Sequence, residues 1–489
     1  MKNFEKIYEL DENGIKHYRV LINGCWNCIS TGSEFEVENP ATGEIIAYVP
    51  DCSLDDIERA VNAAKEFKTW KNYTPIQRLE IMEKTAEILT ENFKELSEII
   101  TIESGKPISV AEGEVKATTE RLKLTQQEVR VLYGEYIPGE WVEDTQNKFA
   151  MVLRKPLGVV AAISSFNYPL YIAAAKIIPT ILAGNSVIAK PSSETPLSLI
   201  YFVRALELAG MPAGTINIIT GRGKIIGDAL VSHNYIDAVT FTGSTNVGMH
   251  IAKLAGMKKL HLELGGKASA IVFEDADIMN AVQHICKGSF RNSGQRCDAV
   301  SRVLVDKKIK KEFLKELLIE SEKYGIGNPL DKKCSVGTLI NKKAIERVEE
   351  LVKNAEENGA VVLKGGKKEG LFYEPTIIDG VTVDMRIAWE EIFGPVIPII
   401  EFESEEEALR VSNQSEYGLD SCIFTENINR ALKISKEMED GTVTINASPA
   451  HGVGHFPFGG NKMSGIGREG LKYSIDELTK LHTIIVNQK

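Results

Sequence analysis

The chain of 489 residues lacks a long uninterrupted hydrophobic run and an excess of positive charge. The longest apolar stretch, Leu170 to Leu182, is interrupted by Lys176 and Pro179 and is too short to cross a bilayer. The N-terminus has no apolar signal-peptide core, so we expect a cytoplasmic protein. A net charge of −11 argues against nucleic acid or an anionic membrane as a partner, although an acidic protein can still hold a local cationic pocket.

Cysteine is also sparse. The chain has seven cysteines, an odd number in a long chain, which does not suggest a disulfide framework. Cys25 and Cys28 have the C-x-x-C spacing of redox or zinc sites, but no second pair of ligands lies nearby. We therefore interpret them as ordinary cysteines on an N-terminal hairpin and predict no metal site.

What the chain does contain is ordinary for a soluble globular protein, with 43% hydrophobic and 26% charged residues. Its length predicts two or three domains. From Leu157 short apolar runs alternate with helical segments, which predicts a parallel sheet covered by helices on both faces, the class that binds nucleotides at the carboxyl ends of its strands. We expect strands at 158–164, 186–189, 216–219 and 238–241 and helices at 169–183, 197–209, 224–231 and 246–255.

Helical signals also precede this region. Ser53 is a good N-cap for a helix at 54–70, and a second helix is expected at 76–104, before Gly105. The polar stretch 136–155 has alternating character, and the run 481–486 near the C-terminus also has the pattern of a strand.

A thiol and a carboxylate carry the strongest chemical signal. Cys297 lies in Ser-Gly-Gln-Arg-Cys-Asp-Ala-Val, directly after Arg296, and Glu263 opens the stretch Glu-Leu-Gly-Gly-Lys. A cysteine attacks as the thiolate, which nearby positive charge favours. A carboxylate can activate the water that later releases a thioester. Alone, each residue has a structural explanation, as a buried cysteine and a solvated strand end.

Together these two segments closely resemble the aldehyde dehydrogenase superfamily, and within it the non-phosphorylating glyceraldehyde-3-phosphate dehydrogenases. The resemblance extends over almost the whole chain. It implies an α/β fold with a Rossmann-type cofactor domain (1–132 and 156–258), an α/β catalytic domain (259–455) and a small β bridging domain (133–155 and 470–489). It further implies a homo-oligomer, either a dimer or a dimer of dimers.

The resemblance also implies the chemistry. Cys297 would attack an aldehyde, and the amide of Asn167 with a backbone N–H would stabilise the resulting oxyanion. Oxidation would leave a thioester, and Glu263 would activate the water that hydrolyses it. The presence of Glu263 argues against an acyl-transferring variant that uses coenzyme A. Retention of all three residues argues against a non-catalytic structural member.

The implied cofactor site surrounds the turn Thr242-Gly243-Ser244, where a helix begins whose N–H groups suit a pyrophosphate. Lys190 would contact the ribose or its 2′-phosphate. NAD-preferring relatives commonly carry an acidic residue where this chain has Ser193, so we expect NADP, with NAD as the alternative, although Glu194 next door weakens this argument. The full expected cofactor set is Ser164, Phe166, Lys190, Ser193, Gly227, Asp228, Gly243, Ser244, Gly248, Leu264, Glu391 and Phe393.

The implied substrate is a small, anionic aldehyde. Arg296 suits a phosphate, because its planar fork can bind two oxygens, and Tyr168 matches the family's substrate tyrosine. Two family arginines fall at Ala117 and His451, and Arg121 and Arg291 are the expected replacements, although a solvated helix end is as good an explanation for Arg291. Glyceraldehyde 3-phosphate is the leading candidate, and glyceraldehyde, lactaldehyde and succinate semialdehyde are the alternatives.

Overall fold

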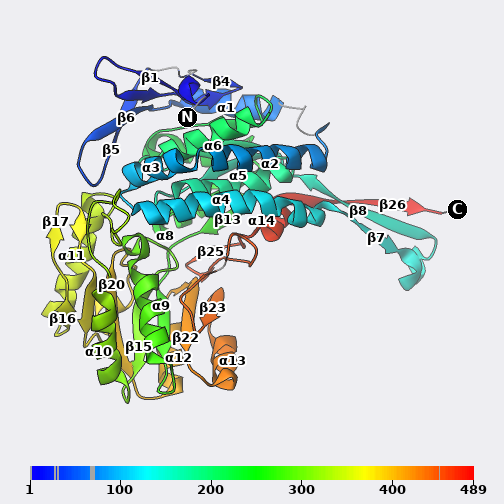
Figure 1. Ribbon diagram of the computed structural model, residues 1–489. Helices are drawn as coiled ribbons and strands as arrows, with labels where there is room; N and C mark the ends of the chain where they lie inside the picture. Colours follow the sequence, from blue (N-terminus) through cyan, green and yellow to red (C-terminus); the bar gives the residue numbers. More distant parts are fainter. Residues whose placement is uncertain (1–2, 27–28, 30–31, 67–71, 451, 489) are drawn as a thin grey trace.

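The computed structural model describes residues 3–26, 29, 32–66, 72–450 and 452–488. A six-stranded sheet forms the centre of its upper part (Figure 1), in the order β11-β10-β9-β12-β13-β25. All neighbours in it are parallel except β25, which runs antiparallel to β13. The strands are β9 (Val159–Ile163), β10 (Ser186–Lys190), β11 (Ile216–Ile218), β12 (Ala238–Thr242), β13 (Lys259–Glu263) and β25 (Gly465–Ile466).

The predicted alternation of strands and helices is confirmed here, with ends within two residues of those expected. Buried apolar strands explain this, because β9 and β10 are buried at every position and so must be covered by helices on both faces. The connecting helices are α5 (Pro169–Leu182), α6 (Leu197–Leu208), α7 (Gly223–Ser232) and α8 (Thr245–Leu254).

Four earlier helices pack on this sheet or beside it: α1 (Leu54–Glu66), α2 (Pro75–Glu91), α3 (Phe93–Ser104) and α4 (Ile108–Glu128). Ser53 caps α1 as predicted, since its Oγ accepts the Asp56 N–H at 3.3 Å. Residues 67–70 of that expected helix lie outside the described residues. The single helix expected at 76–104 is wrong: it breaks at Asn92, whose side-chain amide donates to the Ile88 carbonyl at 2.8 Å and whose backbone leaves the helical conformation.

A seven-stranded sheet forms the lower part, in the order β16-β19-β20-β15-β14-β22-β23, and only the β16–β19 pair is antiparallel. Its strands are β14 (Ala268–Val272), β15 (Val300–Asp306), β16 (Val361–Lys364), β19 (Thr376–Asp379), β20 (Val396–Phe402), β22 (Asp420–Phe424) and β23 (Thr442–Ile445). Its helices are α9 (Ile278–Phe290), α10 (Lys310–Ser321), α11 (Lys342–Glu357), α12 (Glu405–Asn413) and α13 (Ile428–Glu437).

The first sheet extends past residue 258, where we expected the catalytic domain to begin. β13 pairs with β12 along its whole length, so the upper sheet continues to Glu263. The chain then passes into β14 of the lower sheet within a few residues. Glu263 therefore lies at the carboxyl end of one sheet and at the junction with the other. The domain boundaries themselves stay a prediction.

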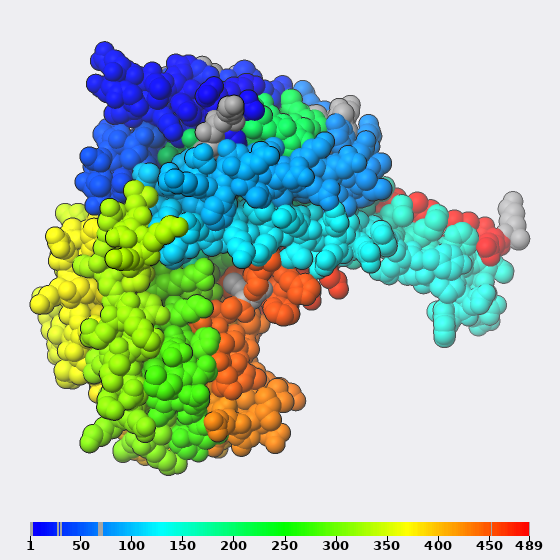
Figure 2. All heavy atoms as spheres, viewed as in Figure 1, coloured from blue at the N-terminus to red at the C-terminus, as the bar shows by residue number. Residues whose placement is uncertain are grey.

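A three-stranded antiparallel sheet, β26-β8-β7, projects from the body as an arm (Figures 1 and 2). It joins β7 (Glu135–Pro138) and β8 (Lys148–Pro156) to β26 (Thr479–Asn487), as the alternating patterns of both segments predict. The short helix α14 (Leu471–Glu477) leads into it. In the space-filling view the arm stands clear of the lower part, with an open hollow between them (Figure 2).

The remaining strands are short. The N-terminal segment forms the sheet β1-β2-β6-β5 and the hairpin β3–β4, so the expected hairpin is confirmed. Cys25 lies exposed on β4, and Cys28 lies outside the described residues. No helix in the described ranges is long and apolar enough to cross a membrane. The strands are β1 (Tyr8–Leu10), β2 (Lys16–Tyr18), β3 (Leu21–Ile22), β4 (Cys25–Trp26), β5 (Glu34–Glu38), β6 (Ile45–Pro50), β17 (Lys368–Glu369), β18 (Phe372–Tyr373), β21 (Tyr417–Gly418) and β24 (Asn461–Lys462).

Candidate active site

A cleft of about 1210 Å³ lies at the carboxyl ends of β9, β10 and β12 and is closed on its other side by loops of the lower sheet. Parallel sheets bind ligands at this edge, because the loops that follow their strands meet there. The cleft reaches Cys297. The expected residues that line it are Ser164, Phe166, Asn167, Lys190, Ser193, Gly227, Asp228, Gly243, Ser244, Leu264, Cys297, Glu391 and Phe393.

The turn between β12 and α8 has the geometry of an anion site. Ser244 occupies the N-cap of α8, but its side chain makes no capping hydrogen bond. The first N–H groups of the helix and its dipole therefore remain suited to a phosphate. Gly248 does not line the cleft. A Cβ there would lie 2.2 Å from the Leu264 side chain, so glycine lets α8 pack directly against Leu264.

Lys190 ends β10 and is buried at the wall of the cleft. Its Nζ donates to the Pro191 carbonyl at 3.2 Å, and burial lowers the pKa of Lys190 to about 8. Ser193 lines the same wall, whereas the Glu194 carboxylate accepts from Asn341 Nδ2 at 3.1 Å and is not among the lining residues. The acidic neighbour of Ser193 is thus held by Asn341, and a lysine and a serine face the cleft.

Glu391 and Phe393 close the opposite wall. Glu391 Oε1 accepts the Gly266 N–H at 3.1 Å, and burial raises the pKa of Glu391. Phe393 has a φ of +54°, an uncommon conformation for a bulky residue, and its ring meets Phe166 edge-on at 5.8 Å. Such backbone strain occurs where the surrounding structure imposes a conformation.

Cys297 follows a strained turn, because Asn292, Ser293 and Gly294 all have positive φ values. A Cβ on Gly294 would lie 2.1 Å from the Gly394 carbonyl, so only glycine fits there. Burial raises the pKa of the Cys297 thiol well above its usual range, the Asp298 and Glu263 carboxylates add to this, and Arg296 opposes it. The expectation that a nearby cation favours the thiolate is therefore outweighed in this state.

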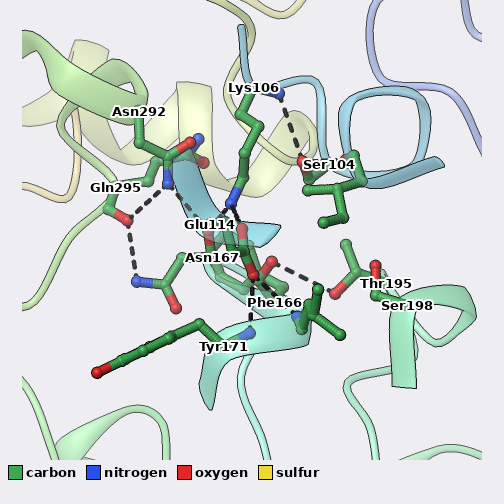
Figure 3. Close-up of polar contacts among 12 residues, drawn as sticks. Ser104, Lys106, Glu114, Phe166, Asn167, Tyr171, Thr195, Ser198, Asn292 and Gln295 are labelled. Atoms are coloured by element: carbon green, nitrogen blue, oxygen red, sulfur yellow. Dashed lines mark hydrogen bonds and ion pairs between the residues drawn. The ribbon is translucent and has the colours of Figure 1, made fainter. Parts of the chain in front are cut away.

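Asn167 lies in the loop after β9, beside the loop that holds Cys297. Its Nδ2 donates to the Gln295 carbonyl at 3.0 Å, which places the amide next to the segment that holds Cys297 (Figure 3). Its backbone carbonyl accepts from Lys106 Nζ at 2.6 Å and from Asn292 Nδ2 at 3.1 Å. The loop that holds the expected oxyanion donor is thus fixed by two side chains from other elements.

Glu263 ends β13 and is 2% exposed. Its Oε1 lies 2.9 Å from His261 Nε2, and its Oε2 has no hydrogen-bond partner among the described residues. Burial raises the pKa of the Glu263 carboxyl well above its usual range, and the Glu469 carboxylate adds to this, while Lys176 and Arg468 oppose it.

Of the expected substrate residues that the structure describes, none lines this cleft, and several are already paired. Arg296 Nη2 donates to Asp298 Oδ2 at 2.7 Å. Arg121 is fully buried, 3.5 Å from a Glu469 oxygen and 3.2 Å from the Tyr171 hydroxyl. The Tyr168 ring centre lies 4.1 Å from Lys106 Nζ. Arg291 begins the turn before Cys297, with its guanidinium near Gly113, and His451 lies outside the described residues.

Comparison with known proteins gives the family. Residues 26–484 match the aldehyde dehydrogenase family. The chain belongs to that family. It is 42% identical to a lactaldehyde dehydrogenase of Methanococcus aeolicus, covering 96% of this chain and 100% of the relative. It is 41% identical to an NADP-dependent glyceraldehyde-3-phosphate dehydrogenase of Streptococcus equinus, covering 96% and 98% of the two chains.

A solved structure agrees with this aldehyde dehydrogenase along nearly its whole length. The NADP-dependent glyceraldehyde-3-phosphate dehydrogenase of Bacillus halodurans C-125, complexed with NADP, has 40% identity and a TM-score of 0.94, covering 96% of this chain and 99% of that one. A 3-sulfolactaldehyde dehydrogenase of Priestia megaterium is 38% identical, covering 97% and 98%. The expected family and fold are thereby confirmed.

Several residues around the site of this aldehyde dehydrogenase were not predicted from the sequence. Lys106 and Glu114 form a fully buried ion pair 2.5 Å apart, and Glu114 accepts the backbone N–H groups of Leu170 and Tyr171 at 2.9 and 3.0 Å (Figure 3). Nothing local marks them, because their partners lie far along the chain. His261 did have a signal, since residues two apart on a strand face the same side and His261 precedes Glu263 by two.

Proposed function

We propose that this aldehyde dehydrogenase oxidises glyceraldehyde 3-phosphate to 3-phosphoglycerate with NADP as the electron acceptor. The named relatives support a common substrate shape. Lactaldehyde, glyceraldehyde 3-phosphate and 3-sulfolactaldehyde are all three-carbon 2-hydroxyaldehydes, and they differ only in the substituent on C3. The question is therefore which C3 substituent this chain accepts.

The buried Arg296 guanidinium carries the proposal. It belongs to the residue before Cys297 and its side chain is 10% exposed. A charge of this kind beside the nucleophile suits an anionic C3 group at the other end of a three-carbon substrate. Arg291 lies on the same turn and adds positive charge.

In the proposed reaction Cys297 attacks the aldehyde carbon and forms a thiohemiacetal. The Asn167 amide would exchange its bond to the Gln295 carbonyl for one to the developing oxyanion. NADP, when bound, supplies the hydride acceptor. Glu263 then takes a proton from water, which attacks the Cys297 thioester and releases the acid.

The cleft fits NADP on this chain's own residues. Lys190 is buried and Ser193 lines the same wall, so a 2′-phosphate would meet a cation and a hydroxyl donor rather than a carboxylate. The free helix end at Ser244 suits the pyrophosphate. The Glu391 carboxylate, which has a second oxygen besides the one that binds Gly266, suits ribose hydroxyl groups.

Lactaldehyde is the second candidate, and the pairing of Arg296 favours it. Because Asp298 already accepts a hydrogen bond from this guanidinium, a phosphate would have to compete with a carboxylate at the same donor. A neutral C3 methyl group would not. Arg121, held by Glu469, offers no additional free charge.

Rates of NADPH formation with the two aldehydes, without inorganic phosphate or coenzyme A, distinguish the candidates. We expect kcat/KM for glyceraldehyde 3-phosphate to exceed that for lactaldehyde at least ~10-fold, because a charged hydrogen bond contributes about 1.5–3 kcal/mol. The reverse order would assign the enzyme to lactaldehyde. Cys297→Ala is the control: it should bind NADP and form no NADPH, and residual turnover would refute the catalytic assignment.

We also propose that the arm pairs with a second copy of the chain. Its three strands expose apolar side chains on both faces, and a small sheet exposed on both faces is not stable alone. The exposed group includes Tyr136, Ile137, Met151, Leu153, Leu481, Ile484 and Ile485.

A further inference from the structure

Gln295 lies two residues before Cys297, and its side chain is hydrogen-bonded to the backbone of a neighbouring loop. The residue is 2% exposed. Its Oε1 accepts the Ile340 N–H at 2.9 Å, and its Nε2 donates to the Thr338 carbonyl at 3.1 Å. Both partners belong to the loop before α11, and Ile340 lines the cleft. One side chain therefore attaches the loop that holds Cys297 to a wall of the cleft.

The backbone carbonyl of Gln295 holds the amide that is expected to stabilise the oxyanion. It accepts from Asn167 Nδ2 at 3.0 Å and from Asn292 Nδ2 at 3.2 Å (Figure 3). In the proposed reaction the Asn167 amide leaves this carbonyl for the oxyanion. Because the Asn292 amide stays, the buried carbonyl keeps a donor, and the exchange avoids the cost of an unsatisfied polar group.

Further contacts close a ring of hydrogen bonds through four segments of the chain. Thr338 donates its N–H to the Gly105 carbonyl at 3.1 Å, and the next residue, Lys106, donates from Nζ to the Asn167 carbonyl at 2.6 Å. The Asn167 amide then returns to Gln295. Every residue of the ring is buried. Removal of any member would therefore leave a buried polar group without its partner, which is costly.

Glycines let two segments of this ring approach each other directly. Gly105 has a φ of +71°, and a Cβ there would lie 1.8 Å from Thr338 Oγ1. A Cβ on Gly337 would lie 2.0 Å from the Gly105 carbonyl oxygen. The backbone at Thr338 thus packs directly against the turn between α3 and α4. The Gln295 side chain is therefore bonded to a backbone segment whose own position is fixed by packing.

A carboxamide matches the two backbone groups that bind it. It offers an acceptor and a donor on the same neutral group, whereas leucine offers neither and a carboxylate offers only acceptors. A carboxylate oxygen would face the Thr338 carbonyl without a proton to share. A protonated carboxyl group, in contrast, could accept from Ile340 and donate to Thr338.

We propose that the Gln295 side chain is a positioning residue for aldehyde oxidation, which fixes the Gln295 carbonyl and so places the Asn167 amide beside the Cys297 thiol. The inference rests on the proposed function, in which Cys297 is the nucleophile and Asn167 stabilises the oxyanion. Gln295 is not among the residues that line the cleft, so it acts only through its neighbours. It should therefore affect the rate of the chemical steps rather than the affinity for NADP.

Gln295→Leu tests this role, because it roughly keeps the volume of the side chain and removes both of its hydrogen bonds. The measurement is the single-turnover rate of NADPH formation, with enzyme in excess over the aldehyde and with saturating NADP. We expect this rate to fall by about 10- to 100-fold, since a misplacement of about 1 Å can cost about 100-fold. The Kd for NADP should stay close to the wild-type value.

Asn185→Leu is the matched control. Asn185 is also a fully buried carboxamide held by two backbone groups, since its Oδ1 accepts the Gly158 N–H and its Nδ2 donates to the Leu478 carbonyl, both at 2.9 Å. It precedes β10, at the end of the strand opposite the cleft. Both variants should have lower melting temperatures, but only Gln295→Leu should form NADPH slowly. A wild-type rate in Gln295→Leu, or an equal loss of rate in Asn185→Leu, would overturn the inference.

Gln295→Glu gives a second readout, which a purely structural loss would not produce and which remains usable if Gln295→Leu does not fold. Burial should raise the pKa of a glutamate at this position, and protonation restores the donor to Thr338. The single-turnover rate relative to the wild type should therefore rise several-fold as the pH is lowered from about 8 to about 6. A ratio that stays low across this range would contradict the proposed role. Cys297→Ala, run in parallel, separates the two claims, because NADPH formation there would refute the proposed nucleophile itself.

Discussion

Arg296 and Asp298, the two residues that flank Cys297, form a buried ion pair, with Nη2 2.7 Å from Oδ2. Both side chains are at most 10% exposed. Cys297 therefore lies between a cation and an anion whose charges largely cancel each other. Asp298 also raises the pKa of Cys297, second only to burial. This single pair thus affects both the positive charge available to an anionic substrate and the reactivity of the Cys297 thiol.

Asp298→Asn should free Arg296 and remove the carboxylate that raises the pKa of Cys297 most. We expect kcat/KM for glyceraldehyde 3-phosphate to rise about 3- to 10-fold, the effect of up to about one pKa unit, with a smaller change for lactaldehyde. Alkylation of Cys297 by iodoacetamide at pH 7 should also accelerate, because the pKa of the thiol falls.

Asp55→Asn, at an exposed position in the first turn of α1, is the control for loss of one negative charge. It should change neither rate. If Asp298→Asn instead weakens the preference for the phosphorylated substrate, then Asp298 orients Arg296 for phosphate rather than competing with it.

The affinity for NADP should depend on pH through Lys190. Burial lowers the pKa of Lys190 to about 8, so the lysine is charged below that pH and loses its charge as pH rises through it. The Kd of the free enzyme for NADP should therefore increase above about pH 8, and the Kd for NAD, which lacks the 2′-phosphate, should change less. Fluorescence titrations with both cofactors over this range provide the measurement.

Two substitutions at Lys190 complete that experiment. Lys190→Arg keeps a charge at all these pH values, so its NADP affinity should stay level across pH 8. Lys190→Met should bind NADP weakly at every pH. A wild-type pH dependence retained in Lys190→Met would assign the titration to another group.

Lys106 should support both stability and catalysis, because it joins the Glu114 carboxylate to the Asn167 carbonyl (Figure 3). Lys106→Met leaves a buried carboxylate without its partner, a loss that typically costs about 3–5 kcal/mol. We expect a lower melting temperature and, in protein that remains folded, a lower kcat as the Asn167 loop shifts. Lys116→Met, on the exposed side of α4, is the control and should change neither value. If Lys106→Met has lower stability but an unchanged kcat, then the ion pair stabilises the fold without positioning the Asn167 loop for catalysis.

The parts of this molecule that follow from local pattern were predictable. Buried apolar strands alternating with helices reproduce the upper sheet, and the alternation around Phe149 and Leu481 reproduces the arm. Residues at the carboxyl ends of these strands meet in one cleft, so Lys190 and Gly243 come together as expected. The cleft also reaches Cys297, which lies between α9 and β15 of the lower part. The break at Asn92 was missed because an asparagine that bonds to its own helix leaves only a weak signal.

Long-range pairing explains the rest. The partner of Arg121 is Glu469, near the C-terminus, and no pattern around Arg121 identifies it. Nor does adjacency to Cys297 tell whether the Arg296 guanidinium points to a ligand or to Asp298. A sequence shows how many arginines lie near a candidate site but not which of them are already paired. It therefore overestimates the positive charge that remains free to bind an anion.

The arm offers a test of assembly that does not involve the active site. Ile485 on β26 is 67% exposed and lies among other exposed apolar side chains on a sheet that stands clear of the body (Figure 2). If a second copy covers this surface, Ile485→Asp buries an unpaired charge in the interface, which costs several kcal/mol and should shift the protein to a smaller species in analytical ultracentrifugation.

Lys472→Asp, a charge change at an exposed residue of α14, is the control and should leave the sedimentation coefficient unchanged. A wild-type chain that already sediments as a monomer would refute the proposed assembly, since the exposed strands would then be stable in water without a partner.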